Sequence, residues 1–170
     1  METPVVDFHT HAGRWGNLGV DDDPKRFIAA MDAAGIDRAN INCIFHSDAP
    51  KGNNIVAERF VAQYPNRFIG VAFVTPHYPE EAIPELERAF DELGLRSLKV
   101  YANYYGKPID DDGFFPIFEW CNNRGITLMT HSSYGAADGT LTDPSRFVGL
   151  AKRFSRMKWV LAHSGNARPG

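Results

Sequence analysis

The stretch PIFEWCNNRGITLMTH, from Pro116 to His131, holds a helical pattern followed directly by a strand pattern. The helical part ends at Gly125, and glycine commonly follows the last turn of a helix. Residues 126–130 form an apolar run that predicts a strand, and His131 stands at the end of that strand. The same alternation of apolar strand and longer helix recurs along the whole chain, so this block indicates the class of fold.

The alternation predicts six strands and five helices. The strands are expected at Val5–His9, Ala39–Phe45, Phe68–Val74, Ser97–Tyr101, Ile126–Thr130 and Trp159–Ala162. The helices are expected at Pro24–Ala34, Asn54–Tyr64, Glu80–Leu93, Asp112–Arg124 and Asp143–Phe154. Pro84 lies inside the third helix and predicts a late start or a kink there, because proline removes a backbone hydrogen bond.

Strands that are joined through helices run parallel, since each connection must cross back over the sheet. The strand centres are about 31 residues apart, and eight such units need roughly 245 residues, which is close to the length of a complete (β/α)8 barrel. The 170 residues therefore hold about six units. An open doubly wound sheet is the alternative, although no glycine-rich phosphate loop follows the first strand. Spacing alone does not choose between that sheet and an incomplete barrel.

Composition and charge exclude several classes of protein. The chain is 44% hydrophobic and 23% charged, which excludes intrinsic disorder. Its net charge is −3 and no basic run is present, so we expect no nucleic-acid and no membrane partner. There is no run of roughly 20 apolar residues and no signal-peptide pattern. Cys43 and Cys121 lie far apart in apolar segments, so we expect neither a disulfide framework nor a thiolate zinc site, and a cytoplasmic location.

Four of the six histidines stand at the ends of predicted strands. His9 and His11 end the first strand two residues apart, and such side chains point to the same face. His131 ends the fifth strand and His163 ends the sixth. The carboxyl ends of parallel strands form the active face of α/β enzymes, and histidine is the usual nitrogen ligand of catalytic zinc. A single HxH motif is weak, but four histidines at one end of the strands predict a metal site.

Several segments together resemble a known family. The DFHTH opening, the FIGVAFV strand, the PIFEWCNNRGITLMTH block and the WVLAHSGN end are similar to the amidohydrolase-related metal-dependent hydrolases, and in particular to the aminocarboxymuconate semialdehyde decarboxylase-like subgroup. The resemblance implies an α/β fold of the TIM (β/α)8 barrel type with one divalent metal ion, zinc first and manganese as the alternative. It implies His9, His11 and His131 as metal ligands and His163 as the catalytic acid/base or polarising group.

The family also uses an aspartate at the end of an eighth strand, and these 170 residues hold no such position. We therefore expect a single barrel domain over residues 1–170 that is incomplete, with about six βα units, and truncated after its sixth strand. The two unpaired edges of such a sheet favour aggregation or pairing with another chain, including a homo-oligomer.

Three functions follow from this resemblance. The first is a metal-dependent hydrolase that acts on a small, carboxylated cyclic, amide or lactone substrate, because a divalent ion makes hydroxide available at neutral pH. The second is a metal-dependent non-oxidative decarboxylase of a small unsaturated or aromatic acid. The third is of a different class, an inactive barrel fragment or interaction module. The ligand set does not separate hydrolysis from decarboxylation.

Other polar and aromatic residues follow the predicted strands on the active side. An arginine suits a carboxylate substrate and a tryptophan suits a planar one. The candidates for substrate binding are Arg14, Trp15, His46, Lys99 and Tyr101. Strand alternation also puts Asp7 on the face of His9 and His11, where its carboxylate would either orient an imidazole or bond to the backbone.

Overall fold

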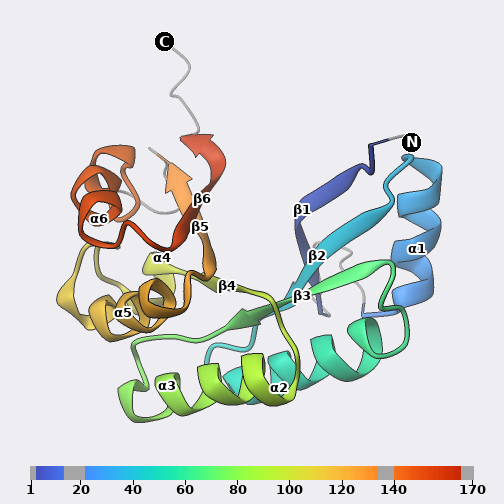
Figure 1. Ribbon diagram of the computed structural model, residues 1–170, viewed down its shortest axis with the longest axis horizontal. Helices are drawn as coiled ribbons and strands as arrows, with labels where there is room; N and C mark the ends of the chain where they lie inside the picture. The colour runs from blue at the N-terminus through green and yellow to red at the C-terminus, as the bar shows by residue number, and fades with distance from the viewer. Residues whose placement is uncertain (1–2, 14–21, 134–139, 166–170) are drawn as a thin grey trace. The chain divides into compact units, whose positions relative to one another are not determined.

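The computed structural model describes residues 3–13, 22–133 and 140–165 (Figure 1). The chain divides into two compact units. Unit 1 comprises Met1–Phe73 and Arg88–Arg96, and unit 2 comprises Val74–Glu87 and Ser97–Gly170. Each unit contains three parallel strands that pair in chain order. The predicted alternation of strands and helices is therefore confirmed.

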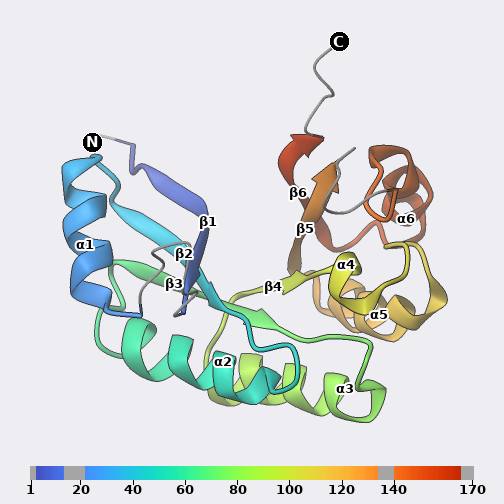
Figure 2. The same ribbon diagram turned by 180° about the vertical axis from the view of Figure 1, so that it is seen from behind.

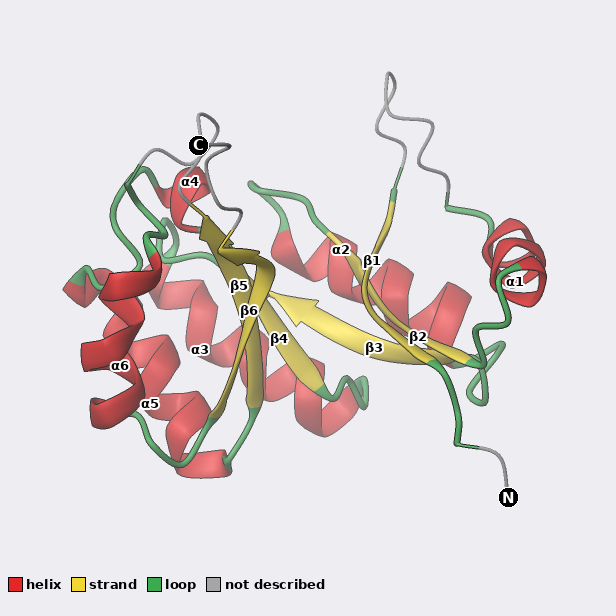
Figure 3. Cartoon of the chain, turned by 90° about the horizontal axis from the view of Figure 1, so that it is seen from above, coloured by secondary structure: helices red, strands yellow, loops and turns green. Residues whose placement is uncertain are grey.

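Unit 1 is built on the parallel strands β1 (Val6–Ala12), β2 (Arg38–Cys43) and β3 (Phe68–Phe73). Its helices are α1 (Pro24–Ala33) and α2 (Ala49–Ile55), with two π-helical segments, η1 (Val56–Val61) and η2 (Arg88–Glu92). η1 continues α2 without a break, and both pack against β2 and β3. Figure 3 shows these helices in red beside the yellow strands.

α1 begins and ends where local signals predict. The carboxylate of Asp23 accepts a hydrogen bond of 3.0 Å from the backbone N–H of Lys25, and Pro24 lies in the first turn. Beyond the C-terminus, Gly35 has a φ of 69°, a left-handed conformation that glycine adopts without the clash of a side chain. The cap, the proline and the glycine thus set the limits of this helix.

α2 begins at Ala49, earlier than the predicted start at Asn54. Its N-terminal signal is present in the sequence, because the carboxylate of Asp48 accepts a hydrogen bond of 3.1 Å from the backbone N–H of Lys51 and Pro50 lies in the first turn. The sequence predicts no helix between residues 49 and 53. Gly52 and Asn53 have low helix propensity, so the sequence pattern does not indicate a helix here. Tertiary contacts stabilise the helix instead.

Two of these poor helix formers are retained for their contacts. Gly52 packs so closely on β2 that a Cβ atom there would collide with the carbonyl oxygen of Cys43. Asn53 is fully buried. Its Nδ2 donates to the carbonyl oxygen of Phe73 (3.1 Å), and its Oδ1 accepts from the backbone N–H of the same residue (2.8 Å). Both contacts fix α2 against the carboxyl ends of the strands of unit 1.

Phenylalanines fill the core of unit 1. The rings of Phe60 and Phe68 meet edge to face with centroids 5.1 Å apart, and Phe27 of α1 packs against Phe60 at 5.6 Å. Phe60 and Phe68 are 0% and 1% exposed. Edge-to-face pairs stabilise a core beyond the area that they bury. This cluster joins α1, η1 and β3.

Unit 2 is built on the parallel strands β4 (Ser97–Val100), β5 (Thr127–Ser133) and β6 (Lys158–Gly165), shown in Figure 2. Its helices are α3 (Pro79–Glu87), α4 (Ala102–Tyr105), α5 (Phe115–Arg124) and α6 (Phe147–Arg153), and two short 3-10 turns are η3 (Asp112–Phe114) and η4 (Pro144–Arg146). Phe118 of α5 is fully buried and packs against Phe114, Phe154 and Trp159 at centroid distances between 5.1 and 5.5 Å.

The helix that contains Pro84 begins at Pro79, so the predicted late start is wrong. The irregularity lies after the proline instead, where the π-helical segment η2 follows α3 directly. The short helix α4, in the tyrosine-rich segment after β4, was not predicted as a helix. In the part of the chain that the structure describes, no helix is both long and apolar enough to cross a membrane.

Both cysteines are free and buried, as predicted. Burial raises the pKa of the Cys43 thiol to about 11, with a further increase from the nearby Asp22, and burial raises that of Cys121 to about 12. Both pKa values lie above the ordinary 9.0, so the stabilisation by these neutral thiols is fully present below pH 9 and is lost as the pH rises toward 11–12.

We therefore expect both thiols to resist a thiol-specific aromatic disulfide reagent at pH 8. Labelling of the native protein should be at least about 100-fold slower than labelling in denaturant, because the thiolate is the nucleophile and the native thiols are protonated and covered. The rate of absorbance change after mixing measures this. Fast labelling of one thiol in the native protein would contradict the burial of that residue.

Candidate functional site

β1 carries the two histidines that the sequence assigns to a metal, and a β-bulge sets their direction. The pairing register with β2 shifts by one residue between Asp7 and Thr10, so the backbone bulges in this interval. The Nε2 atoms of His9 and His11 lie 2.9 Å apart, and the ring centroids are 4.7 Å apart. Both side chains are half-buried. The two imidazoles therefore meet through their Nε2 atoms, at hydrogen-bond distance.

The bulge changes the face of the sheet on which Asp7 lies relative to His11. Asp7 aligns with Ala39 before the bulge, and His11 aligns with Asn42 after it. Residues 39 and 42 lie on opposite faces of β2, so Asp7 does not share the face of His11, and the predicted alternation is wrong here. The carboxylate of Asp7 accepts a hydrogen bond of 3.0 Å from the backbone N–H of His9. The carboxylate of Asp7 thus bonds to the backbone, which is the second of the two roles predicted for it, and this bond stabilises the bulge.

The spacing of the two nitrogens fits one metal ion. Metal–nitrogen bonds to histidine are about 2.0–2.1 Å long, so two neighbouring imidazole ligands hold their nitrogens roughly 3 Å apart. The 2.9 Å between the Nε2 atoms of His9 and His11 is close to this spacing. Residues 3–13, 22–133 and 140–165 hold no group of three or more histidine, cysteine, aspartate or glutamate side chains around one point. The pair could supply two ligands of such a site.

The same face carries a polar residue that the sequence analysis did not single out. Asn42 aligns with His11 and is 0% exposed. Within the described residues, neither its Nδ2 nor its Oδ1 has a hydrogen-bond partner. Asn40, two residues earlier on this face, is 3% exposed. The signal for this face was available, because asparagine alternates with apolar residues in the stretch RANINC of a strand that is otherwise buried.

In unit 2, a second bulge joins the other two histidines. β5 and β6 align His131 with Ala162 but Ser133 with Gly165, so β6 contains one extra residue. His163 has a φ of 67° and is the one non-glycine residue with positive φ in the described part of the chain. Its ring meets that of His131 edge to face, with centroids 4.7 Å apart. Regular alternation would have put the residue after Ala162 on the opposite face.

Tyr101 and Lys99 extend this cluster along β4. Tyr101 is 3% exposed, and its ring meets His131 edge to face at 4.7 Å and stacks on Tyr104 at 4.6 Å. Lys99 is 0% exposed, and its Nζ lies 4.9 Å from the centre of the Tyr101 ring, within the range of a cation–π interaction. Lys99 thus places a buried amine next to the aromatic neighbour of His131.

The other residues predicted to bind substrate are less defined. His46 follows β2, is exposed, and its ring meets Phe73 edge to face with centroids 6.2 Å apart. It lies beyond the carboxyl end of its strand, as the sequence suggests. Arg14 and Trp15 lie outside the described residues.

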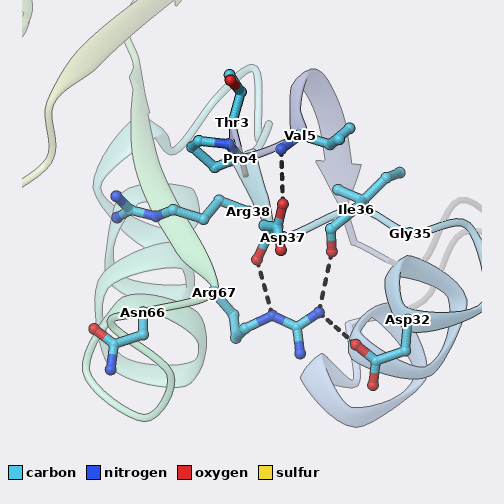
Figure 4. A pocket seen from close by; sticks show the side chains of 10 residues that line it. All are labelled: Thr3, Pro4, Val5, Asp32, Gly35, Ile36, Asp37, Arg38, Asn66 and Arg67. Atoms are coloured by element: carbon cyan, nitrogen blue, oxygen red, sulfur yellow. Dashed lines mark hydrogen bonds and ion pairs between the residues drawn. The ribbon is translucent and has the colours of Figure 1, made fainter. Parts of the chain in front are cut away.

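A surface pocket of about 1020 Å³ lies at the opposite, amino-terminal end of the strands of unit 1 (Figure 4). One of its two arginines, Arg67, donates hydrogen bonds to the carbonyl oxygens of Asp37 (3.0 Å) and Ile36 (3.2 Å) and to the carboxylate of Asp32 (2.6 Å). These bonds tie α1 to the start of β3. Because this end of a βα fold serves stability while chemistry lies at the carboxyl ends, we assign the pocket a structural role.

Comparison with known proteins places the chain in a family. A family model described as "Amidohydrolase" matches residues 6–170. A curated protein of Dictyostelium discoideum, 2-amino-3-carboxymuconate-6-semialdehyde decarboxylase, is 39% identical over 71 residues, which are 42% of this chain and 20% of that protein. The match thus spans a fifth of the length of this relative.

Solved structures show the fold. An uncharacterised TIM-barrel protein from Bordetella bronchiseptica has a TM-score of 0.73 at 19% identity, over 94% of this chain and 66% of that one. A dihydroxybenzoic acid decarboxylase from Polaromonas sp. JS666, with bound manganese and the inhibitor 2-nitroresorcinol, has a TM-score of 0.71 at 20% identity, over 94% and 65%. The fold is therefore α/β of the TIM-barrel type, and the predicted fold class is confirmed. The chain spans about two thirds of the length of these barrel proteins.

Proposed function

Because this chain belongs to the amidohydrolase family, we propose that it acts as a metal-dependent, non-oxidative decarboxylase of a small unsaturated or aromatic carboxylic acid. The observation that carries the proposal is the 39% identity to a decarboxylase. The similar protein from Polaromonas sp. JS666 is also a decarboxylase. These relatives support the carboxy-lyase alternative more than the hydrolase that the sequence analysis put first.

His9, His11 and His131 are the proposed ligands of one divalent metal ion. The support is the 2.9 Å separation of the Nε2 atoms of the first two and the position of the third two residues before the carboxyl end of β5. Manganese is the first candidate because a similar decarboxylase binds it, and zinc is the second because histidine ligands accept several divalent ions. When bound, the ion supplies positive charge that orients the acid and stabilises negative charge.

Decarboxylation breaks the bond between the carboxyl carbon and its neighbour. The electron pair stays on the neighbouring carbon, CO2 leaves, and a proton must reach that carbon. We assign the delivery of this proton to His163, because histidine is the most frequent proton-transfer group in enzymes and this ring lies against His131. The ring of Tyr101 also packs against that of His131, edge to face, and this contact holds the orientation of the imidazole.

The test uses the 170-residue protein loaded with Mn²⁺ or Zn²⁺. A dihydroxybenzoic acid and 2-amino-3-carboxymuconate semialdehyde are incubated with it in D2O. We expect release of CO2 and deuterium at the carbon that carried the carboxyl group. The variant His163→Asn should lower the rate by about 10²–10⁴-fold, the usual contribution of one acid/base group. Consumption of an amide or lactone with addition of water and without CO2 would instead establish the hydrolase.

A further inference from the structure

Lys99 lies at a position of β4 where the fold favours an apolar side chain. The residue is 0% exposed, and it aligns with Met129 of β5, an apolar neighbour on the same face of the sheet of unit 2. Branched apolar side chains usually fill the interior of a βα barrel. An amine is costly to bury, so a leucine or a methionine would fill this space with less loss of free energy. The amine of Lys99 is therefore a candidate for a specific role.

The contact of this amine with an aromatic ring points to the role. The Nζ atom of Lys99 lies 4.9 Å from the centre of the Tyr101 ring. An ammonium group over the face of a ring is attracted by the ring electrons, and the attraction is strongest where water is excluded. Because Lys99 has no exposed surface, water is excluded around it. A protonated Lys99 would therefore favour one placement of the Tyr101 ring.

The Tyr101 ring in turn contacts the proposed metal ligand of unit 2. It meets the ring of His131 edge to face, with centroids 4.7 Å apart, and it stacks on Tyr104 at 4.6 Å. Lys99, Tyr101 and His131 all belong to unit 2. A side chain without exposed surface offers no face to a ligand, so burial favours an indirect role for Lys99 over direct contact with substrate. The contacts connect the amine to the histidine through the tyrosine ring.

We propose that Lys99 is a positioning residue. Its ammonium group holds the ring of Tyr101, and this ring holds the imidazole of His131 in the orientation that binds the metal ion. The inference rests on the proposed function, because that function makes His131 a metal ligand. It adds that the charge of Lys99, and not only its bulk, sets the orientation of this ligand.

The first measurement needs neither metal nor substrate. NMR of the metal-free protein with labelled histidine follows the ring resonances of His131, which respond to the orientation of the adjacent Tyr101 ring, and the variant His131→Asn identifies them. Spectra are compared at about pH 8.5, above the ordinary pKa of histidine. In Lys99→Met, which removes the charge and keeps a long side chain, these resonances should shift. In Lys99→Arg, which keeps the charge, they should stay close to those of the parent. Lys99→Gln serves if the methionine variant does not fold.

The second measurement is the dissociation constant for Mn²⁺ and for Zn²⁺, from titration calorimetry. Lys99→Met should weaken binding by about tenfold, the lower end of the 10–100-fold loss that follows removal of a group that orients a metal ligand. Tyr101→Leu should weaken binding by a similar factor, and Lys99→Met should have no further effect in that background. Tyr101→Phe keeps the ring, so Lys99→Met should have its full effect there.

Lys51→Met is the matched control. The Nζ atom of Lys51 lies 4.7 Å from the centre of the Phe45 ring, so the same substitution removes a lysine–aromatic contact of similar geometry. Lys51 is exposed and belongs to unit 1. This variant should keep both the His131 resonances and the metal affinity of the parent.

Four results would overturn the proposal. Unchanged His131 resonances or an unchanged metal affinity in Lys99→Met would show that Lys99 does not position this ligand. A loss in Lys99→Arg equal to that in Lys99→Met would show that the charge has no part in it. A full loss from Lys99→Met in the Tyr101→Leu background would show a path that bypasses the ring.

Failure of the proposed function gives a different pattern. If the parent bound neither ion, the proposed metal site would be refuted, and the resonances of the metal-free protein would still decide whether Lys99 orients His131. Neither measurement depends on turnover, so absence of CO2 release would count against decarboxylation alone.

Discussion

Replacement of His11 by alanine should weaken the binding of Mn²⁺ and of Zn²⁺ by at least about 100-fold. Loss of a residue that only orients a metal ligand typically weakens metal binding by 10–100-fold, so loss of a ligand itself should have a larger effect. The Nε2 of His11 lies 2.9 Å from that of His9, where it is placed to share one ion with it. Titration calorimetry of the metal-free protein with each ion measures the dissociation constant.

The control for this experiment is His77→Ala. His77 is an exposed histidine whose Nε2–H donates to the carbonyl oxygen of Tyr104 at 2.8 Å, and it contacts none of the proposed ligands. Its removal should leave metal affinity unchanged. Equal metal content in the parent and in His11→Ala after dialysis would show that β1 does not hold the ion.

The variant Gly52→Ala should destabilise the fold by about 3 kcal/mol. The added Cβ would collide with the carbonyl oxygen of Cys43, and a backbone atom cannot move away as a side chain does. Overpacking of a core usually costs about 1–3 kcal/mol, and a backbone contact belongs at the upper end of this range. Urea unfolding followed by circular dichroism measures the free energy of unfolding.

Gly149→Ala is the matched helical control. Gly149 lies in α6, and a Cβ atom there meets nothing within 4 Å. Alanine is favoured over glycine in a helix by roughly 1 kcal/mol, so this variant should be more stable than the parent. If Gly52→Ala gave the same gain, the close packing of α2 on β2 would be refuted.

Local sequence signals were sufficient to predict the ends of a helix whose capping residues lie next to it in the sequence. Asp23 and Gly35 mark the ends of α1. The fifth strand forms where the apolar run predicts it, but it continues past His131 to Ser133. The start of α2 was missed although Asp48 and Pro50 mark it, since Gly52 and Asn53 lower the helical propensity of the segment. Their retention depends on contacts with β2 and β3, which no local pattern contains.

The bulges could not be predicted for a different reason. Regular alternation correctly puts His9 and His11 together, but it wrongly adds Asp7 to their face. It would also separate His163 from the face of His131, whereas the bulge in β6 brings the two rings into contact. One extra residue in a strand exchanges its faces, and the choice of that residue depends on the pairing of two strands.

The left-handed backbone at His163 has a consequence for relatives of this chain. Glycine and asparagine adopt positive φ more readily than most residues, so either can replace the histidine and preserve the turn. Under the role proposed for His163, a replacement at this position would remove the reaction while the path of the strand is inherited unchanged. A homologue whose backbone superimposes here would share the architecture, and the identity of its side chain at this position would tell whether it shares the proposed chemistry.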